Sequence, residues 1–170
     1  IRQQISVVVS MGDDTVVLTT GGRSEDYARK ILEFPEHSYI QMGDFSGYTI
    51  SQCAKKDIKK AYVCGFIGKF AKMATGVKQT HVKGSKVNMQ FLSEIAKKCK
   101  AEQTIIKEIK NANTARNVQE IILENNIEGF FDEICSQVYK QLTNHSKNKT
   151  PVEIILFDFD GNVLARYPKQ

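Results

Sequence analysis

Residues 15–34 read TVVLTTGGRSEDYARKILEF, and this stretch decides the fold class. The β-rich run at 15–20 ends in two glycines, and the residues after the glycines have the spacing of an amphipathic helix. Ser24 stands where the N-cap of that helix is expected, and Pro35 follows the helix end. The stretch therefore predicts a strand, a tight turn and a helix, which is how an α/β fold begins.

The same alternation continues along the chain. Two more strand-like runs are each followed by a helical pattern, and the second run lacks polar alternation, as expected for a strand covered on both faces. Helical patterns then dominate up to a final pair of strand segments, which are connected to each other at residues 160–162. The predicted later strands are 38–42 and 60–67, the predicted helices fall at 45–56, 69–76, 87–100, 103–111, 114–126 and 128–146, and the final pair covers 152–167.

We therefore predict a three-layer α/β/α domain over residues 1–170, with a mostly parallel sheet, extra C-terminal helices and a closing strand pair. A length of 170 residues suffices for one sizeable core. Residues 1–12 resemble the tail of an amphipathic helix and do not begin with Met, so we expect the chain to be part of a longer protein.

Composition narrows the class of protein. No apolar run reaches the roughly 20 residues that span a bilayer, so no membrane association is expected. The four cysteines, at 53, 64, 99 and 135, form no CxxC pair. This pattern favours free, buried thiols in a cytoplasmic protein over a zinc ribbon or a redox motif.

Positive charge gathers in the middle of the chain. No acidic residue occurs between Asp57 and Glu94, whereas lysines recur throughout that interval. The run indicates either a region that attracts an anionic partner or an ordinary solvated lysine face. Few aromatic residues alternate with the lysines, so a nucleic-acid partner is unlikely. The lysines are Lys59, Lys60, Lys69, Lys72, Lys78, Lys83 and Lys86.

The turn after the first strand is the first candidate site. Thr20, Gly21 and Gly22 would let a ligand approach the backbone where a helix begins. Glu25 already places negative charge in the first helical turn, so a zwitterionic or neutral ligand fits better than a polyphosphate. Asp44, at the end of the second strand, could accept hydrogen bonds from ribose hydroxyls. Each feature could equally be a plain turn.

A second candidate site follows the third strand. Lys69 and Lys72 fall near the start of the next helix, and Thr80, His81 and Lys83 lie on the loop beyond. These side chains could bind carboxylates of a large substrate. His81 could also accept a proton near neutral pH, although a single loop histidine is often only polar surface.

The segment 157–162, FDFDGN, is similar to the DxDG motif of haloacid-dehalogenase-type phosphatases. That motif needs a catalytic domain after it, and the sequence given ends at Gln170, so a hairpin or strand-end turn is the better interpretation. The three histidines are scattered in sequence, and no metal site is predicted.

Four blocks taken together resemble the CbiD family of cobalt-precorrin-5B C1-methyltransferases, in the order and spacing of that family. They lie within residues 13–125, and VEIILFDFDGNVLA at 152–165 resembles the family's closing strands. The blocks are VVLTTGGRSEDYAR (16–29), YIQMGDFSGYTI (39–50), AYVCGFIGKFAKMATGVKQTH (61–81) and NTARNVQEII (113–122).

The resemblance implies methylation of C1 of cobalt-precorrin-5B in anaerobic cobalamin synthesis, with S-adenosylmethionine as the donor. An anionic tetrapyrrole would be the substrate, and a family N-terminal domain would complete the enzyme. On this basis Thr20, Gly21, Gly22 and Asp44 are expected to bind the donor, and His81 to act as a base. The residues expected to face the substrate are Arg23, Lys69, Lys72, Thr80 and Lys83.

A non-catalytic α/β module that binds an anionic partner such as RNA is the alternative. Homo-oligomerisation is compatible with either interpretation, and the sequence gives no oligomeric state. Salt-dependent retention on RNA would favour the alternative, whereas binding of the donor product S-adenosylhomocysteine would favour the enzyme.

Overall fold

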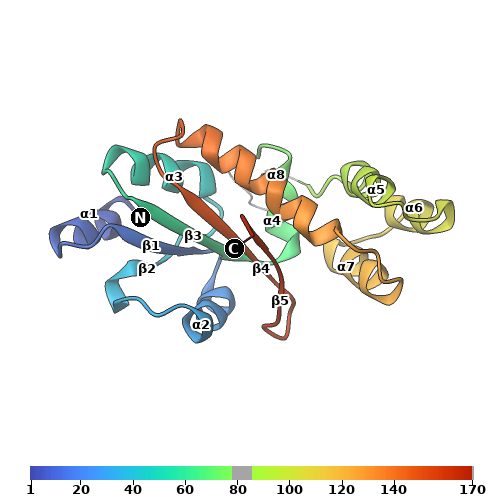
Figure 1. Ribbon diagram of the computed structural model, residues 1–170, viewed down its shortest axis with the longest axis horizontal. Coiled ribbons are helices and arrows are strands. Elements are labelled where there is room, and N and C mark those ends of the chain that lie inside the picture. Colours follow the sequence, from blue (N-terminus) through green and yellow to red (C-terminus); the bar gives the residue numbers. More distant parts are fainter. Residues whose placement is uncertain (78–85, 170) are drawn as a thin grey trace.

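The computed structural model describes residues 1–77 and 86–169, which form a five-stranded sheet with helices on both faces (Figure 1). The strand order is β2-β1-β3-β4-β5; the first four strands are mutually parallel, and β5 runs antiparallel to β4. The strands are β1 (Thr15–Thr19), β2 (Tyr39–Gln41), β3 (Lys60–Gly65), β4 (Val152–Phe157) and β5 (Val163–Tyr167).

Helices connect these strands and extend the molecule at one end. In Figure 1, α5, α6 and α7 form a lobe beside the sheet, and the long α8 returns the chain from this lobe to β4. The helices are α1 (Arg2–Ser10), α2 (Gly22–Ile31), the 3₁₀ turn η1 (Glu36–Ser38), α3 (Ser46–Lys55), α4 (Ile67–Ala74), α5 (Met89–Lys98), α6 (Gln103–Lys110), α7 (Ala115–Glu124) and α8 (Phe130–His145).

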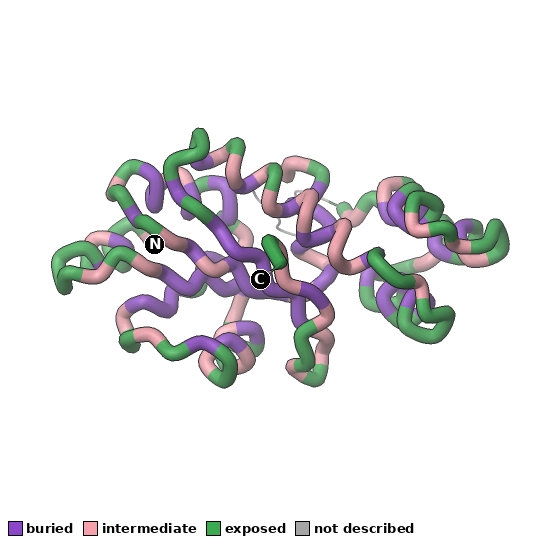
Figure 2. Tube along the Cα trace, in the orientation of Figure 1, coloured by how far each residue is buried: buried purple, intermediate pink, exposed green. Residues whose placement is uncertain are grey.

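The sheet is buried on both faces because its strands alternate between two hydrophobic clusters. On β1, Val16 and Leu18 join the large cluster with α1, α3, α4 and α8, whereas Val17 joins a smaller cluster beneath α2. Figure 2 shows the strands as the continuous buried centre of the molecule. The predicted three-layer fold with a mostly parallel sheet, extra helices and a closing strand pair is confirmed.

The path of the chain creates a switch point at the carboxyl ends of β1 and β3. From β1 the chain crosses outward to β2, and it then returns to β3 on the other side of β1. The loops after β1 and β3 therefore diverge, and in open α/β sheets the crevice between such loops is where ligands bind. The fold places the candidate site there.

The segment that resembles a phosphatase motif forms the turn between β4 and β5. Asp158 accepts hydrogen bonds from the backbone N–H of Asp160 at 2.9 Å and of Asn162 at 2.8 Å. Gly161 adopts a φ of 92°, and a Cβ there would lie 2.6 Å from Cδ1 of Tyr27. The turn interpretation of this segment is confirmed.

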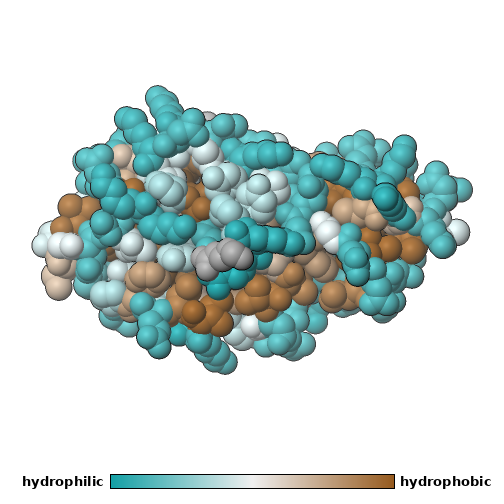
Figure 3. All heavy atoms as spheres, in the orientation of Figure 1, coloured by the Kyte–Doolittle hydropathy of each residue, from teal (hydrophilic) through white to brown (hydrophobic). Residues whose placement is uncertain are grey.

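No described helix combines the length and the apolar character needed to cross a membrane. In Figure 3 hydrophilic residues cover most of the visible face, and hydrophobic residues gather along its lower edge. All four cysteines are free; Cys53, Cys64 and Cys135 are buried and Cys99 is half-buried. The prediction of free thiols is confirmed, and burial is complete for three of them.

Candidate functional site

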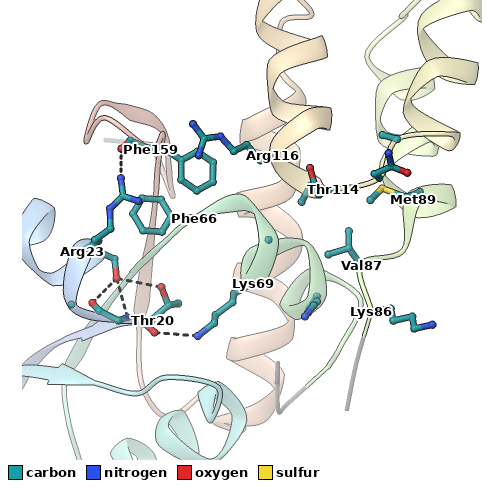
Figure 4. A pocket seen from close by; sticks show the side chains of 18 residues that line it. Thr20, Arg23, Phe66, Lys69, Lys86, Val87, Met89, Thr114, Arg116 and Phe159 are labelled. Atoms are coloured by element: carbon teal, nitrogen blue, oxygen red, sulfur yellow. Dashed lines mark hydrogen bonds between the residues drawn. The ribbon is translucent and has the colours of Figure 1, made fainter. Parts of the chain in front are cut away.

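A cleft of about 920 Å³ opens at the switch point (Figure 4). Its wall combines the loops after β1 and β3 with the first turns of α5 and α7 and with the tip of the β4–β5 hairpin. Its size is near the upper end of the range for small-molecule sites, about 300–1,000 Å³. The lining residues come from 20–24, from Phe66, 68–69 and 72, from 86–87 and 89, from 112–116, and from Phe159.

Hydrogen bonds hold the loop after β1 in a tight turn. Ser24 Oγ accepts from Gly21 N at 3.1 Å, donates to Gly21 O at 2.9 Å, and lies 3.2 Å from Thr20 Oγ1. The helix begins at Gly22 with Gly21 as its N-cap, so the prediction that Ser24 is the N-cap is wrong. Ser24 lies in the first turn and reaches back to close the loop, because glycine has no side chain to cap with.

Gly65 allows the loops after β1 and β3 to approach closely. A Cβ at Gly65 would lie 2.8 Å from Cγ2 of Thr20 and 2.9 Å from Cε1 of Phe70. The Thr20 N–H also bonds to Cys64 O at 3.2 Å, which extends the pairing of the two strands to the mouth of the cleft. Only glycine fits between these two side chains.

Lys69 connects three predicted site segments. Its Nζ lies 3.0 Å from Oδ1 of Asp44 and donates to the carbonyl of Thr20 at 3.2 Å. The loops after β1 and β2 therefore meet at one edge of the sheet, as predicted. The ammonium of Lys69 lies between them, and Asp44 itself is not part of the cleft wall.

The cleft wall is positively charged. It contains basic side chains from four elements and no acidic side chain among the residues that the structure describes. Helices α2, α4, α5 and α7 also point their N-termini into it, which adds the positive ends of four helix dipoles. An anionic ligand is therefore favoured. The basic residues are Arg23, Lys69, Lys72, Lys86 and Arg116.

The lysine run that the sequence singled out does not form one surface. Lys59 and Lys60 stand at the start of β3, whereas Lys69 and Lys72 follow its end, so a strand of about 20 Å separates the pairs. Lys72 is buried, with 7% of its surface exposed. Of the five lysines of the run that the structure describes, two therefore lie away from the site and three line it, together with Arg23 and Arg116 from outside the run.

An aromatic stack forms one side of the cleft. The rings of Phe66 and Phe159 are 5.1 Å apart and nearly parallel, at 13°. Arg23 and Arg116 lie over these rings, with Cζ 5.6 Å from the centroid of Phe66 and 4.5 Å from that of Phe159. The carbonyl of Phe159 accepts from Nη2 of Arg23 at 2.6 Å and from the Tyr27 hydroxyl at 3.0 Å. The hairpin tip is thereby fixed to α2.

Most of the sequence-predicted site residues that the structure describes meet in this cleft. Asp44 contacts the site through Lys69, and three predicted residues, Thr80, His81 and Lys83, lie outside the described residues. The sequence analysis did not predict Phe66, Phe159 and Arg116 as site residues. The predicted helix start at Thr114 was the local signal that could have drawn attention to Arg116. The predicted residues in the cleft wall are Thr20, Gly21, Gly22, Arg23, Lys69 and Lys72.

The described part of the wall suits binding and positioning better than proton transfer. It contains no carboxylate, imidazole or thiol, and Cys64, next to Gly65, is fully buried. Burial raises the pKa of the Cys64 thiol, which keeps it protonated and unreactive. Within residues 1–77 and 86–169, no cluster of three or more His, Cys, Asp or Glu side chains could hold a metal ion.

Comparison with known proteins gives a consistent family. The model of the CbiD C-terminal domain matches residues 79–168. The cobalt-precorrin-5B C(1)-methyltransferase of Priestia megaterium is 36% identical over 167 residues, which are 98% of this chain and 46% of that protein. The protein of the same name from Leptospira borgpetersenii serovar Hardjo-bovis (strain JB197) is 41% identical over 155 residues, 91% of this chain and 42% of the relative.

The chain thus spans a little under half the length of these relatives. No solved structure matches it significantly. The family model covers more than half of the chain, and the alignments to the relatives extend over nearly all of it. The chain belongs to the CbiD family.

Proposed function

We propose that this chain forms part of an S-adenosylmethionine-dependent methyltransferase that methylates C1 of cobalt-precorrin-5B in cobalamin synthesis. The relatives carry that enzyme's name. The observation that carries the proposal here is one cleft at the switch point, in which the glycine turn at the start of α2 and five basic side chains line the same wall. We further propose that the enzyme acts in the cytoplasm, where free cysteines such as these persist.

The end of the cleft at α2 suits the methyl donor. S-adenosylmethionine is a zwitterion at its amino-acid moiety and supplies a methyl group on a sulfonium. The first-turn N–H groups of α2 have no intrahelical acceptor and would bind a carboxylate. The ammonium of Lys69 at this end is already ion-paired with Asp44 at 3.0 Å, so its positive charge is compensated within the protein. A net-neutral amino-acid group fits it better than a polyanion.

The basic side chains of the wall suit a polycarboxylate ring. Lys72, Lys86 and Arg116 line the cleft, and a corrin precursor has many acetate and propionate groups. The positive wall would attract the ring and orient it through ion pairs. Methyl transfer is an in-line displacement, in which the C1–methyl bond forms as the sulfur–methyl bond breaks. Its rate depends mainly on holding the two reactants in line.

Two predicted residues take more specific roles in this proposal. Asp44 orients Lys69, and the ammonium of Lys69 in turn holds the Thr20 carbonyl, so we assign Asp44 a positioning role in donor binding. If the ring must lose a proton on methylation, His81 is the proposed base. His81 lies outside the described residues, and its role stays a prediction.

Calorimetric titration of S-adenosylhomocysteine into the chain tests the donor site, and Gly21→Leu is the informative variant. Gly21 has an extended backbone, and nothing lies within 4 Å of a Cβ placed there, so the fold should tolerate a side chain. Because Gly21 lines the cleft, the leucine would occupy the donor end. We expect an unchanged urea midpoint and lost binding. A folded parent chain that produces no heat would refute the donor site.

RNA binding remains the alternative to test. Phe66 and Phe159 are exposed in part beside basic residues, which is the combination that single-stranded nucleic acids use. The separation of Lys59 and Lys60 from the cleft argues against an extended backbone-tracking groove. Retention on immobilised RNA that falls steeply with salt, together with no binding of S-adenosylhomocysteine, would reverse our preference.

A further inference from the structure

We propose that Arg116 is a specificity-determining residue that binds a carboxylate at the rim of the substrate ring, held in position by Phe159. This inference rests on the proposed function and deepens it, because it names one contact between the cleft and the anionic substrate. Arg116 lies within the block 113–122 that resembles the family, but neither the sequence patterns nor the resemblance gave it a role. The residues involved are labelled in Figure 4.

The guanidinium of Arg116 is oriented in a way that leaves its donors available. Its Cζ lies over the ring of Phe159 at 4.5 Å, a cation–π contact that uses the charge of the guanidinium and not its N–H groups. The N–H groups are those that bind a carboxylate in bidentate geometry. The contact to Glu120 is a loose ion pair through Nε, at 3.5 Å, between side chains that are 60% and 54% exposed.

The position of Arg116 on its helix is a second, independent observation. Arg116 is the second residue of α7, where the dipole disfavours a cation and favours an anion. The first turn of α7 contains no acidic residue, and the same is true of α4 and α5, whose N-termini also face the cleft. Lys69 likewise lies in the first turn of α4, where Asp44 compensates it at 3.0 Å. Among the described residues, Arg116 has only the loose, exposed ion pair with Glu120, which indicates that an external anion compensates it.

Phe159 gives this arrangement its rigidity. The backbone carbonyl of Phe159 is held by Arg23 and Tyr27, and its ring is stacked on Phe66. The ring under Arg116 is therefore fixed to both the sheet and α2. An arginine stacked on a fixed ring loses little conformational entropy when it binds a ligand, and the preorganised pair can discriminate between ligands by their carboxylates.

The test compares two water-soluble corrinoids that share the ring and differ in the side groups. Cobyrinic acid has carboxylates, and cobinamide has amides in their place. Binding of each to the chain is measured by absorbance titration for the parent, Arg116→Gln, Arg116→Lys and Arg2→Gln. Arg2 is an exposed arginine on α1, outside the cleft wall, so its variant controls for the loss of one charge.

We expect Arg116→Gln to weaken binding of cobyrinic acid about tenfold, the loss expected for one charge-assisted contact. Binding of cobinamide and of S-adenosylhomocysteine should not change, and Arg116→Lys should fall between Arg116→Gln and the parent. Unchanged binding of cobyrinic acid would overturn the role of Arg116 and leave the proposed function standing. Equal weakening of both corrinoids would overturn it too, since Arg116 would then only brace the hairpin. A parent chain that binds neither corrinoid would remove the substrate end of the cleft, whatever the result with S-adenosylhomocysteine.

Discussion

Replacing Gly65 by alanine should destabilise the chain and disturb the cleft together. Gly65 is the last residue of β3, and an added Cβ would lie 2.8 Å from Cγ2 and 3.0 Å from Oγ1 of Thr20. It would also lie 2.9 Å from Cε1 of Phe70. Favourable carbon–carbon contacts lie at about 3.5–4.0 Å, so atoms on two sides would have to move.

Neither neighbour can move easily. Phe70 is fully buried, and a β-branched Thr20 has a stiff χ1 and a hydroxyl 3.2 Å from Ser24 Oγ. Overpacking of this kind costs about 1–3 kcal/mol. Replacing glycine by alanine gains about 0.4–1 kcal/mol from the unfolded state. The net loss in the free energy of unfolding should therefore be about 1–2 kcal/mol.

Circular dichroism in urea is the suitable assay, because the chain contains no tryptophan to report on unfolding. With a typical slope of about 2 kcal/mol per molar urea, the midpoint should fall by about 0.5–1 M. Gly68→Ala is the matched control, since Gly68 lies within α4 and nothing lies within 4 Å of its Cβ position. There alanine should stabilise the helix by up to about 1 kcal/mol.

Opposite effects at two glycines three residues apart would establish the close approach at Gly65. A Gly65→Ala midpoint equal to or above that of the parent would refute this reasoning. Because Gly65→Ala would displace Thr20, this variant should also bind S-adenosylhomocysteine more weakly than the parent. Weakening without loss of stability would mean that the alanine acts in the cleft and not through packing.

Three further predictions follow from particular contacts. Asn117→Glu should complete a capping box with Thr114, whose Oγ1 accepts a hydrogen bond from the Asn117 N–H at 3.0 Å, and so raise the free energy of unfolding by about 0.5–1 kcal/mol. The added negative charge should also weaken binding of cobyrinic acid. A thermal melt measures the first effect and a titration the second, and tighter binding would contradict the charge argument. Arg166→Leu should cost about 3–5 kcal/mol, because it removes the ion pair that Arg166 makes with the buried carboxylate of Glu153; urea unfolding measures the loss, and a cost below about 1 kcal/mol would contradict this prediction. Although partial burial raises the pKa of Asp158, hydrogen bonds from its own turn outweigh that effect and hold the pKa below the ordinary value. The stabilisation by Asp158 relative to Asp158→Asn should thus be complete above about pH 4 and shrink as the pH falls further. A constant difference in stability down to about pH 2 would contradict this.

The sheet could be predicted because its information is local. The runs at 15–20 and 60–67 are apolar and bounded by glycine, and each leads into a helical pattern, so the strands and their parallel direction follow from short stretches, whereas the order of the strands in the sheet does not. The helix start was misplaced by three residues, from Gly21 to Ser24 as the N-cap. A serine just inside the first turn bonds back to the Gly21 backbone, and in sequence it resembles a cap.

The far wall of the cleft could not be predicted, because it depends on contacts across the whole chain. Phe159 approaches Arg23 from 136 positions away, and Arg116 comes from a lobe whose packing no local pattern specifies. The lysine run predicted only part of the positive wall for a related reason: Lys69, Lys72 and Lys86 line the cleft, whereas Lys59 and Lys60 do not. Sequence proximity joined Lys60 to Lys69, but an extended strand between them carries the two side chains to opposite ends of the sheet.

Charge at the helix starts links the cleft to the stability of the fold. Helix α2 has Glu25 in its first turn, the usual and stabilising choice, whereas α4 and α7 have Lys69 and Arg116 there. Each basic residue at a helix start costs about 0.3–1 kcal/mol, and natural chains break such local rules mainly at functional sites. Asp44 already compensates Lys69, and a bound polycarboxylate would compensate Arg116. Because a ligand that binds only the folded state stabilises it, cobyrinic acid should raise the melting temperature of this chain, and it should raise that of Arg116→Gln less. An equal rise in melting temperature for both proteins would show that the anion binds to other basic residues of the wall.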